Sequence, residues 1–270
     1  MNVSIFHDMT CKLPLPGLLE GVANIIRTDE KLAVFTRSYR QTGSKTFKNE
    51  SQLFSVACLF EGGKGRSNIR QLTGMSLVDF DHVVPHTEEQ FKSHTDSTDF
   101  TDAETVLIND SISSEGAKSV RSVRSVCHDT TRFLNELKAK IIADPHTLMS
   151  YITMSGNGLR VIFTYEIAPE FSGVPKDEEE VKKFEAYYQQ AFYAGNAYYE
   201  KLLGAKADMQ CKNITRLSGL AHDPDVFLRP EAEVVPFTTE EISTAAAAYA
   251  KQSKEDKQMQ RIETYFDTLI

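Results

Sequence analysis

The stretch LMSYITMSGNGLRVIFTYEI at residues 148–167 contains two apolar runs on either side of a short polar segment that ends in Asn157-Gly158. Asn-Gly between runs of β-branched and aromatic residues is a strong local signal for a β-hairpin. We therefore predict two antiparallel strands joined by a tight Asn157-Gly158 turn. Because hairpins pair their strands antiparallel, this stretch argues against a purely parallel, doubly wound sheet.

The flanking sequence predicts strands and helices in mixed order. MSLVDFDHVV (75–84) indicates an apolar strand that Pro85 ends, and residues 176–203 indicate a long amphipathic, Tyr-rich helix. The predicted fold class is α/β (α+β): a mostly antiparallel mixed sheet covered by helices. Further predicted strands are LAVFTRSYR (32–40), QLFSVACLF (52–60) and one or two from RLSGLAHD (216–223) onward; further predicted helices are 16–29, 66–74, 129–143, 239–252 and 255–268.

Length and composition set the domain organisation. A chain of 270 residues with 41% hydrophobic content can bury a sizeable core. We predict one main domain at 1–235 and a C-terminal helical extension at 236–270. Residues 94–127 are poor in large apolar side chains and rich in Ser, Thr and Asp, which indicates a mobile insertion or excursion within the main domain.

Composition also narrows the compartment and the partners. Four scattered cysteines form no C-x-x-C pair, so they predict neither a zinc ribbon nor a redox motif, and we expect free thiols in a reducing compartment. The N-terminal sequence lacks a basic start followed by an apolar block, and no window approaches the roughly 18 apolar residues of a membrane span. We expect a cytoplasmic protein without a membrane partner.

The charge argues against a protein that coats nucleic acid but leaves a local basic groove open. The net charge is −8, whereas residues 31–70 contain eight Lys and Arg against two Glu. Within that basic stretch, Gly62-Gly63-Lys64-Gly65-Arg66 lacks the P-loop spacing, and a plain hairpin turn explains it. Because this segment lies in the basic stretch, four residues of the stretch remain candidate contacts to phosphate or template: Arg37, Arg40, Lys64 and Arg66.

Asp79 and Asp81 lie two residues apart at the end of the strand Leu77-Val78-Asp79-Phe80-Asp81. Residues i and i+2 of a strand lie on one face about 7 Å apart, so two carboxylates there repel each other unless a cation neutralises them. Oxygen ligands suit Mg²⁺ or Mn²⁺, and two such ions about 4 Å apart can stabilise an in-line phosphoryl displacement. The structural alternative, in which one Asp caps the next turn and the other faces solvent, stays open for this pattern alone.

Two later segments carry further candidates. In Ser155-Gly156-Asn157-Gly158-Leu159-Arg160, a hairpin turn explains Asn157 and Gly158. It does not explain the small residues before them or the cation after them, which would let backbone amides and a guanidinium approach a triphosphate. Asp208 follows the end of the 176–203 helix and precedes Arg216; a turn residue and a surface cation are the alternative interpretation of that pair.

These segments, in this order, resemble the archaeo-eukaryotic primase (primase-polymerase) superfamily. Its members have an apolar strand ending in D-x-D, then an S-G-x-G-x-H hairpin motif, then a later Asp. The chain resembles more closely the VirE-like N-terminal domain family of bacterial mobile-element proteins, over residues 30 to 235. The segments that carry this closer likeness are Leu72-Thr73-Gly74 before Val78-Asp79-Phe80-Asp81-His82, then Ser155 to Arg160, then Asn213-Ile214-Thr215-Arg216-Leu217 followed by His222-Asp223-Pro224-Asp225.

The resemblance implies a fold and a set of site residues. The fold would be a primase-polymerase core related to the RNA-recognition-motif topology, over residues 1–235. The superfamily His is replaced by Arg160, which cannot shuttle a proton at neutral pH, so nucleotide binding tolerates the change more easily than polymerisation does. The implied catalytic residues and Mg²⁺ or Mn²⁺ ligands are Asp79, Asp81 and Asp208; the implied nucleotide contacts are Ser155, Gly156, Gly158, Arg160 and Arg216.

The function implied by the resemblance is divalent-metal-dependent nucleotidyl transfer in a replication or mobile-element setting. The expected ligands and partners are a nucleoside triphosphate, single-stranded DNA, and a helicase or another mobile-element protein. Two alternatives stay open. One is a catalytically inactive accessory module that binds nucleotide or single-stranded DNA; the other is a partner-binding protein without a ligand site, which uses its Tyr-rich and C-terminal helices. The exchange of His for Arg160 leaves enzymatic activity itself undecided.

Overall fold

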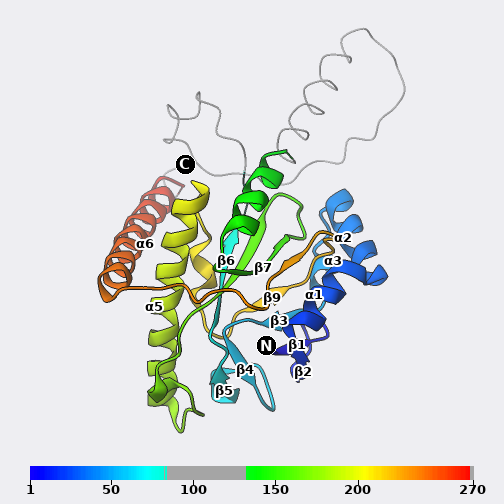
Figure 1. The fold of residues 1–270 in the computed structure, drawn as a ribbon. Helices are drawn as coiled ribbons and strands as arrows, with labels where there is room; N and C mark the ends of the chain where they lie inside the picture. The colour runs from blue at the N-terminus through cyan, green and yellow to red at the C-terminus, as the bar shows by residue number, and fades with distance from the viewer. Residues whose placement is uncertain (82, 84–131, 268–270) are drawn as a thin grey trace.

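The computed structural model describes residues 1–81, 83 and 132–267. Within them, antiparallel strands and helices form an α+β fold, which confirms the predicted class. Helices α5 and α6 lie on one side of the strands and α1, α2 and α3 lie on the other (Figure 1). The predicted insertion at 94–127 lies outside the described residues.

The central sheet has the strand order β10-β7-β8-β6, and its strand pairs are antiparallel. Strands β6, β7 and β8 are almost entirely buried, whereas β10 is partly buried. Burial on both faces explains the continuous apolar runs in the sequence. The predicted hairpin and the predicted apolar strand are confirmed. The strands are β6 (Met75–Phe80), β7 (Thr147–Ile152), β8 (Leu159–Thr164) and β10 (Phe227–Leu228).

A second antiparallel sheet has the order β2-β1-β3-β9. The prediction of one strand at 52–60 is wrong: Val56 and Ala57 separate two short strands that pair in different sheets. A fully buried run carries no alternation that would reveal such a break. The strands of this sheet are β1 (Asn2–Phe6), β2 (Leu15–Leu18), β3 (Leu53–Ser55) and β9 (Leu217–Gly219), and a separate pair is β4 (Cys58–Phe60) with β5 (Ile69–Leu72).

The predicted strand at 32–40 is wrong, because these residues belong to helix α2 (Glu30–Thr42). Asp29 caps the helix by accepting a hydrogen bond from the Leu32 amide at 2.6 Å, and Gly43 ends it with φ 67°. Leu32 and Thr36, one turn apart, are the buried residues, so helical spacing fits where strand alternation does not. Helices α1 (Leu19–Thr28) and α3 (Lys45–Glu50) flank α2 in the chain.

The predicted helix at 66–74 is also wrong. The segment is a short 3-10 turn (Arg66–Asn68) followed by strand β5, which pairs with β4. The Gly-rich residues 62–66 therefore connect a β-hairpin, as the plain turn interpretation predicted. Gly62 supplies a positive φ of 71° that this connection requires.

Two long helices and one shorter helix complete the described fold. Helix α5 (Glu178–Leu203) confirms the predicted Tyr-rich helix; Asp177 caps its start and Gly204 its end. Helix α6 (Thr239–Asp267) is continuous, so the prediction of two separate C-terminal helices is wrong, since no Pro or Gly interrupts its helix-forming residues. The helix at 132–143 buries Leu134, Leu137 and Ile141, as its spacing predicted.

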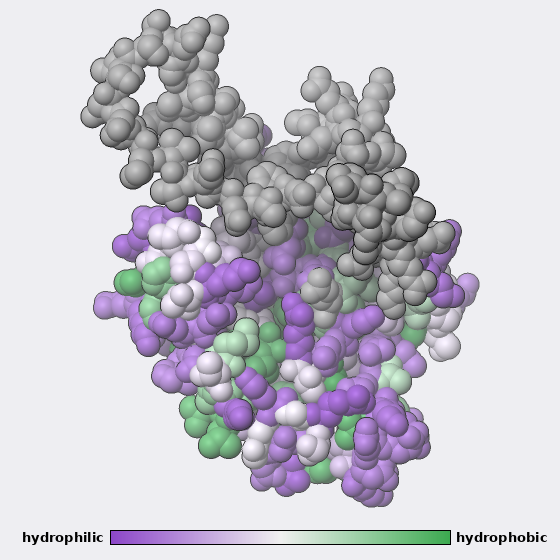
Figure 2. All heavy atoms as spheres, turned by 180° about the vertical axis from the view of Figure 1, so that it is seen from behind, coloured by the Kyte–Doolittle hydropathy of each residue, from purple (hydrophilic) through white to green (hydrophobic). Residues whose placement is uncertain are grey.

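The surface fits a protein with a buried core. The face seen in Figure 2 is mostly hydrophilic, with hydrophobic residues in small separate patches. None of the helices in the described part of the chain has both the length and the apolar character needed to cross a membrane.

Candidate functional site

The site is built around the end of β6. Asp79, the fifth residue of this strand, lies directly opposite Arg160 on β8, and Tyr151 of β7 lies on the other side of Arg160. Directly opposite residues share one face of a sheet. Alternation along β8 places Arg160 on the face opposite Phe163, whose ring packs against α5. Asp79, Arg160 and Tyr151 therefore face away from α5.

Arg160 binds residues of both sheets. Its Nε donates to Asp79 Oδ2 at 3.1 Å, and its Nη1 donates to the carbonyl oxygen of Gly219 at 2.6 Å. Nη1 also lies 3.2 Å from Ser218 Oγ and 3.4 Å from the Tyr151 hydroxyl. Because Ser218 and Gly219 belong to β9, Arg160 links the central sheet to the second sheet. Its side chain is only 15% exposed, so most of this guanidinium is turned inward.

Asp79 is one of the few buried carboxylates of the core, with a side chain 3% exposed. Its Oδ2 accepts from Arg160, while its Oδ1 is buried and has no hydrogen-bond partner among the residues that the structure describes. An unpaired buried carboxylate oxygen is costly, so it marks a position where a further donor or cation would be stabilising.

Asp208 lies beside strand β6, next to Asp79. The backbone amide of Asp208 donates to the carbonyl oxygen of Asp79 at 2.7 Å, although the two residues are far apart in the sequence. This contact follows from α5, which ends at Leu203 and leads the chain back toward the end of β6. The structure therefore joins the first and third predicted carboxylate positions through the backbone.

The pKa of the Cys211 thiol is affected by the charges of several predicted site residues. Cys211 follows Asp208 in a short 3-10 turn (Met209–Lys212), and its Sγ lies 3.9 Å from Asp79 Oδ2. Burial raises the pKa of this thiol to about 12, and the negative charges of Asp79 and Asp208 add to the rise, whereas Arg216 and Arg160 lower it. The charges of four predicted site residues therefore act on this one thiol, and Asp79 is in direct contact with it.

Asp81 lies just beyond the end of β6 and is exposed. It is adjacent to the connection between β7 and β8, residues 153–158, which we call the glycine turn. A Cβ atom on Gly158 would lie 2.5 Å from the Phe80 carbonyl oxygen and 3.2 Å from Asp81 Oδ1. Only glycine allows the turn to approach the end of β6 so closely, and this approach places the Asp81 carboxylate beside the turn.

The glycine turn differs from the predicted tight Asn157-Gly158 turn. Ile152 pairs with Leu159, so the connection is longer, and the positive φ of 78° occurs at Gly156. The Gly156 amide donates to the Thr153 carbonyl oxygen at 3.0 Å, and the Ser155 hydroxyl lies 3.0 Å from Thr153 Oγ1. The hairpin itself was predicted correctly, but the Asn-Gly signal placed its turn two residues too late.

Helix α2 covers the other flank of the glycine turn. Arg40 donates from Nε to the Met154 carbonyl oxygen at 3.3 Å and from Nη2 to the Thr153 carbonyl oxygen at 3.2 Å. Four residues earlier, the hydroxyl of Thr36 accepts from the His222 amide at 2.9 Å. The two Arg40 contacts hold the end of α2 against the glycine turn. The role of Arg40 in binding phosphate or template stays a prediction.

A second buried ion pair lies nearby and was missed from sequence. Lys138 Nζ lies 2.8 Å from Asp223 Oδ2, which also accepts from the Ile152 amide at 2.9 Å, and the two side chains are 8% and 4% exposed. The pair joins the helix at 132–143 to the end of β7. Asp223 had been noted in the sequence only as part of a family likeness; Lys138 gave no signal, because a lone lysine on an amphipathic helix usually faces solvent.

Lys64 and Arg66, two further basic candidates, lie apart from the carboxylates. Lys64 donates to the Met9 carbonyl oxygen at 2.7 Å, and Arg66 forms an ion pair with Glu185 of α5. Both are in the β4–β5 connection, which lies beyond the start of β6 rather than its end (Figure 1). Arg37 is exposed on α2. The role of Arg37, Lys64 and Arg66 in binding a template stays a prediction.

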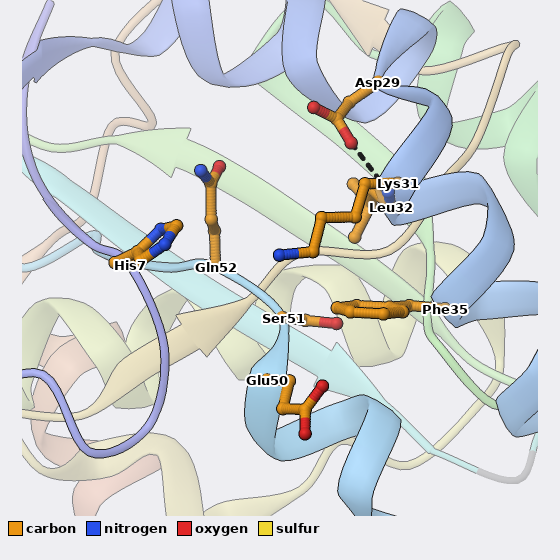
Figure 3. Close-up of a pocket in the computed structure, with 8 residues that line it drawn as sticks. All are labelled: His7, Asp29, Lys31, Leu32, Phe35, Glu50, Ser51 and Gln52. Carbon is orange, nitrogen blue, oxygen red and sulfur yellow. Dashed lines mark hydrogen bonds between the residues drawn. The ribbon is translucent and has the colours of Figure 1, made fainter.

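A small polar pocket lies elsewhere, between α2 and the segment before β3 (Figure 3). The Lys31 ammonium points into it, toward Gln52, while Asp29 is engaged as the cap of α2. Its volume of about 40 Å³ holds a few water molecules, well below the roughly 300–1,000 Å³ of ligand pockets. This pocket contains none of the predicted site residues and is not a nucleotide site.

A comparison with protein families finds a match over part of the chain. A family model described as BT4734-like, N-terminal domain, matches residues 128–228, which include Arg160, Asp208 and Arg216; Asp79 and Asp81 precede the matched segment. No curated protein and no solved structure matches the chain. Residues 128–228 are therefore similar to a BT4734-like N-terminal domain.

Proposed function

We propose that this chain is a primase-polymerase-like nucleotidyltransferase domain, dependent on Mg²⁺ or Mn²⁺, that acts in a replication or mobile-element setting. The observation that carries the proposal is the 2.7 Å backbone hydrogen bond from Asp208 to Asp79. It brings the backbone of Asp208, the third acidic residue of the motif order, to the end of β6, where Asp81 lies against the glycine turn. Three separated segments thus meet at one end of the central sheet.

The possible ligand atoms at this end of the sheet are of the chemical type that hard divalent cations prefer. They are carboxylate oxygens, and Asp79 Oδ1 is a buried oxygen that lacks a partner among the described residues. The side chains do not form a finished ligand set, since no group of three or more His, Cys, Asp or Glu in the described ranges is arranged to hold a metal ion. The proposal therefore requires Asp81 and Asp208 to turn toward Asp79 when the ion binds.

Each residue has a defined part in the proposed reaction. Asp79, Asp81 and Asp208 would hold the ions, which supply charge neutralisation for an in-line attack on the α-phosphorus. The small residues Ser155, Gly156 and Gly158 would let the triphosphate approach the turn. Arg160 fixes the orientation of Asp79 through its 3.1 Å hydrogen bond. Arg216 would contribute positive charge near this end of the sheet, because its charge lowers the pKa of the Cys211 thiol.

A second function, a binding module without turnover, is favoured by one observation. Arg160 stands where the superfamily has His, and it occupies Asp79 Oδ2. If this ion pair persists in the complex, the site would bind nucleotide or single-stranded DNA and serve as an accessory to a helicase or another mobile-element protein. The third alternative, a partner-binding protein without a ligand site, would leave Asp79 and Asp208 far apart, whereas their backbones are hydrogen-bonded.

The decisive assay is primer synthesis and extension with Mn²⁺, labelled nucleotides and single-stranded templates. We expect product from the wild type and a loss of about 100-fold or more in Asp81→Asn, because charge stabilisation of the transition state is lost. Glu231→Gln, which also removes one exposed carboxylate, is the matched control and should keep wild-type activity. Metal-dependent nucleotide binding without any product would favour the binding module, and the absence of both would reject the proposed site.

A further inference from the structure

The guanidinium that the sequence assigned to phosphate is engaged inside the protein. Arg160 donates to Asp79, Gly219 and Ser218, and its side chain is largely buried. Turning it toward a ligand would leave the Gly219 carbonyl oxygen and the Asp79 carboxylate without their donor, at a cost that such burial makes large. A triphosphate at the glycine turn therefore needs a different cation.

Arg40 has the required position. A Cβ atom on Gly156 would lie 3.0 Å from Arg40 Nε and 3.4 Å from its Cζ, so the guanidinium lies directly against this residue. Its bonds to the Met154 and Thr153 carbonyl oxygens hold it in one orientation. A group that is already fixed loses little conformational entropy when a ligand binds.

Arg40 also keeps binding capacity. Two of its nitrogens, Nε and Nη2, bond to the turn, and Nη1 donates to no residue that the structure describes. The residue is exposed overall. The nearby carboxylate of Asp223 is paired with Lys138, so the charge of Arg40 is not consumed by a dedicated partner. Guanidinium groups bind phosphate oxygens strongly through such free N–H groups.

The turn separates this cation from the carboxylates. Arg40 packs on Gly156 and Asp81 packs on Gly158, and two residues span at most about 7 Å. A polyphosphate lying across the turn would therefore meet a fixed positive charge at one flank and the carboxylates at the other.

We propose that Arg40, packed against Gly156 of the glycine turn, forms a metal-independent phosphate subsite that holds the phosphate tail of the nucleotide. This inference rests on the proposed nucleotide site and specifies which cation serves it. The subsite binds phosphate in the absence of divalent ions, whereas the carboxylates require them.

Calorimetry with sodium tripolyphosphate in EDTA tests the subsite on the full chain. We expect Arg40→Gln to bind about tenfold more weakly than the wild type, because it removes a charged hydrogen-bond donor. Lys45→Gln, which removes one exposed lysine from the neighbouring helix α3, is the control and should bind like the wild type. Arg40→Lys keeps the charge but loses the planar guanidinium with its several N–H donors, so its affinity should fall between those of the wild type and Arg40→Gln.

The outcomes separate this inference from the proposed function. Equal affinity of the wild type and Arg40→Gln, or no binding by the wild type, overturns the subsite, whether or not the wild type extends primers. Weaker binding by Arg40→Gln supports the subsite even if no primer is extended, in which case only the enzymatic proposal fails. If Arg40→Gln does not fold, Arg40→Lys decides: weaker binding than the wild type supports the subsite, and equal binding overturns it.

Discussion

At the scale of single residues, Arg160 shows how strand register decides the role of a side chain. The sequence presents it as a cation beside a turn. In the folded chain it lies between Asp79 and Tyr151 and reaches Ser218 and Gly219 on another sheet. A buried guanidinium with these partners positions a carboxylate and stabilises the fold. This role could not be read from the sequence, because β9 is distant along the chain.

Replacing Arg160 tests this role. Arg160→Met leaves the Asp79 carboxylate buried without its cation, so the free energy of unfolding should fall by about 3 kcal/mol or more. Urea denaturation followed by circular dichroism measures the change. Lys48→Met on the exposed surface of α3 is the control, for which we expect a change within about 0.5 kcal/mol. Equal midpoints for the two variants would show that Arg160 contributes no more than a surface cation.

At the scale of elements, the sequence correctly predicted the strands and helices that neighbouring residues in the chain specify by themselves. Strands β6, β7 and β8 are continuous apolar runs, and α5 carries a helical period between the caps Asp177 and Gly204. Helix α2 was mistaken for a strand because its β-branched and aromatic residues outweighed its caps, Asp29 and Gly43. The division of residues 52–60 between two sheets depends on tertiary pairing, which no local pattern carries.

Packing of α5 on β8 gives a prediction at this scale. A Cβ atom on Gly195 would lie 2.0 Å from Phe163 Cζ, so Gly195→Ala should lower the free energy of unfolding by about 1–3 kcal/mol. A Cβ atom on Gly21 of α1 would have no atom within 4 Å. Gly21→Ala should therefore raise the free energy of unfolding by about 0.5–1 kcal/mol. Denaturation of both variants measures the contrast. Changes of the same sign would mean that α5 does not approach β8 so closely.

At the scale of the whole molecule, the fold assembles the candidate site from distant parts of the chain. The sequence predicted Asp79 and Asp81 as a pair from their spacing on a strand. Asp208 was linked to them only by a family resemblance, because its proximity depends on how α5 returns the chain to β6. Arg40 was one of four basic candidates, and only the packing of α2 against the glycine turn distinguishes it from Lys64 and Arg66.

The central claim is that Asp79, Asp81 and Asp208 hold one divalent-cation site. Crystals soaked with Mn²⁺ and a non-hydrolysable nucleoside triphosphate test it directly through the anomalous signal of manganese. We predict a peak within about 2–2.5 Å of carboxylate oxygens of Asp79 and Asp81, with Asp208 completing the site and the phosphates along the glycine turn. Manganese bound only elsewhere, or a nucleotide bound away from these carboxylates, would contradict the account.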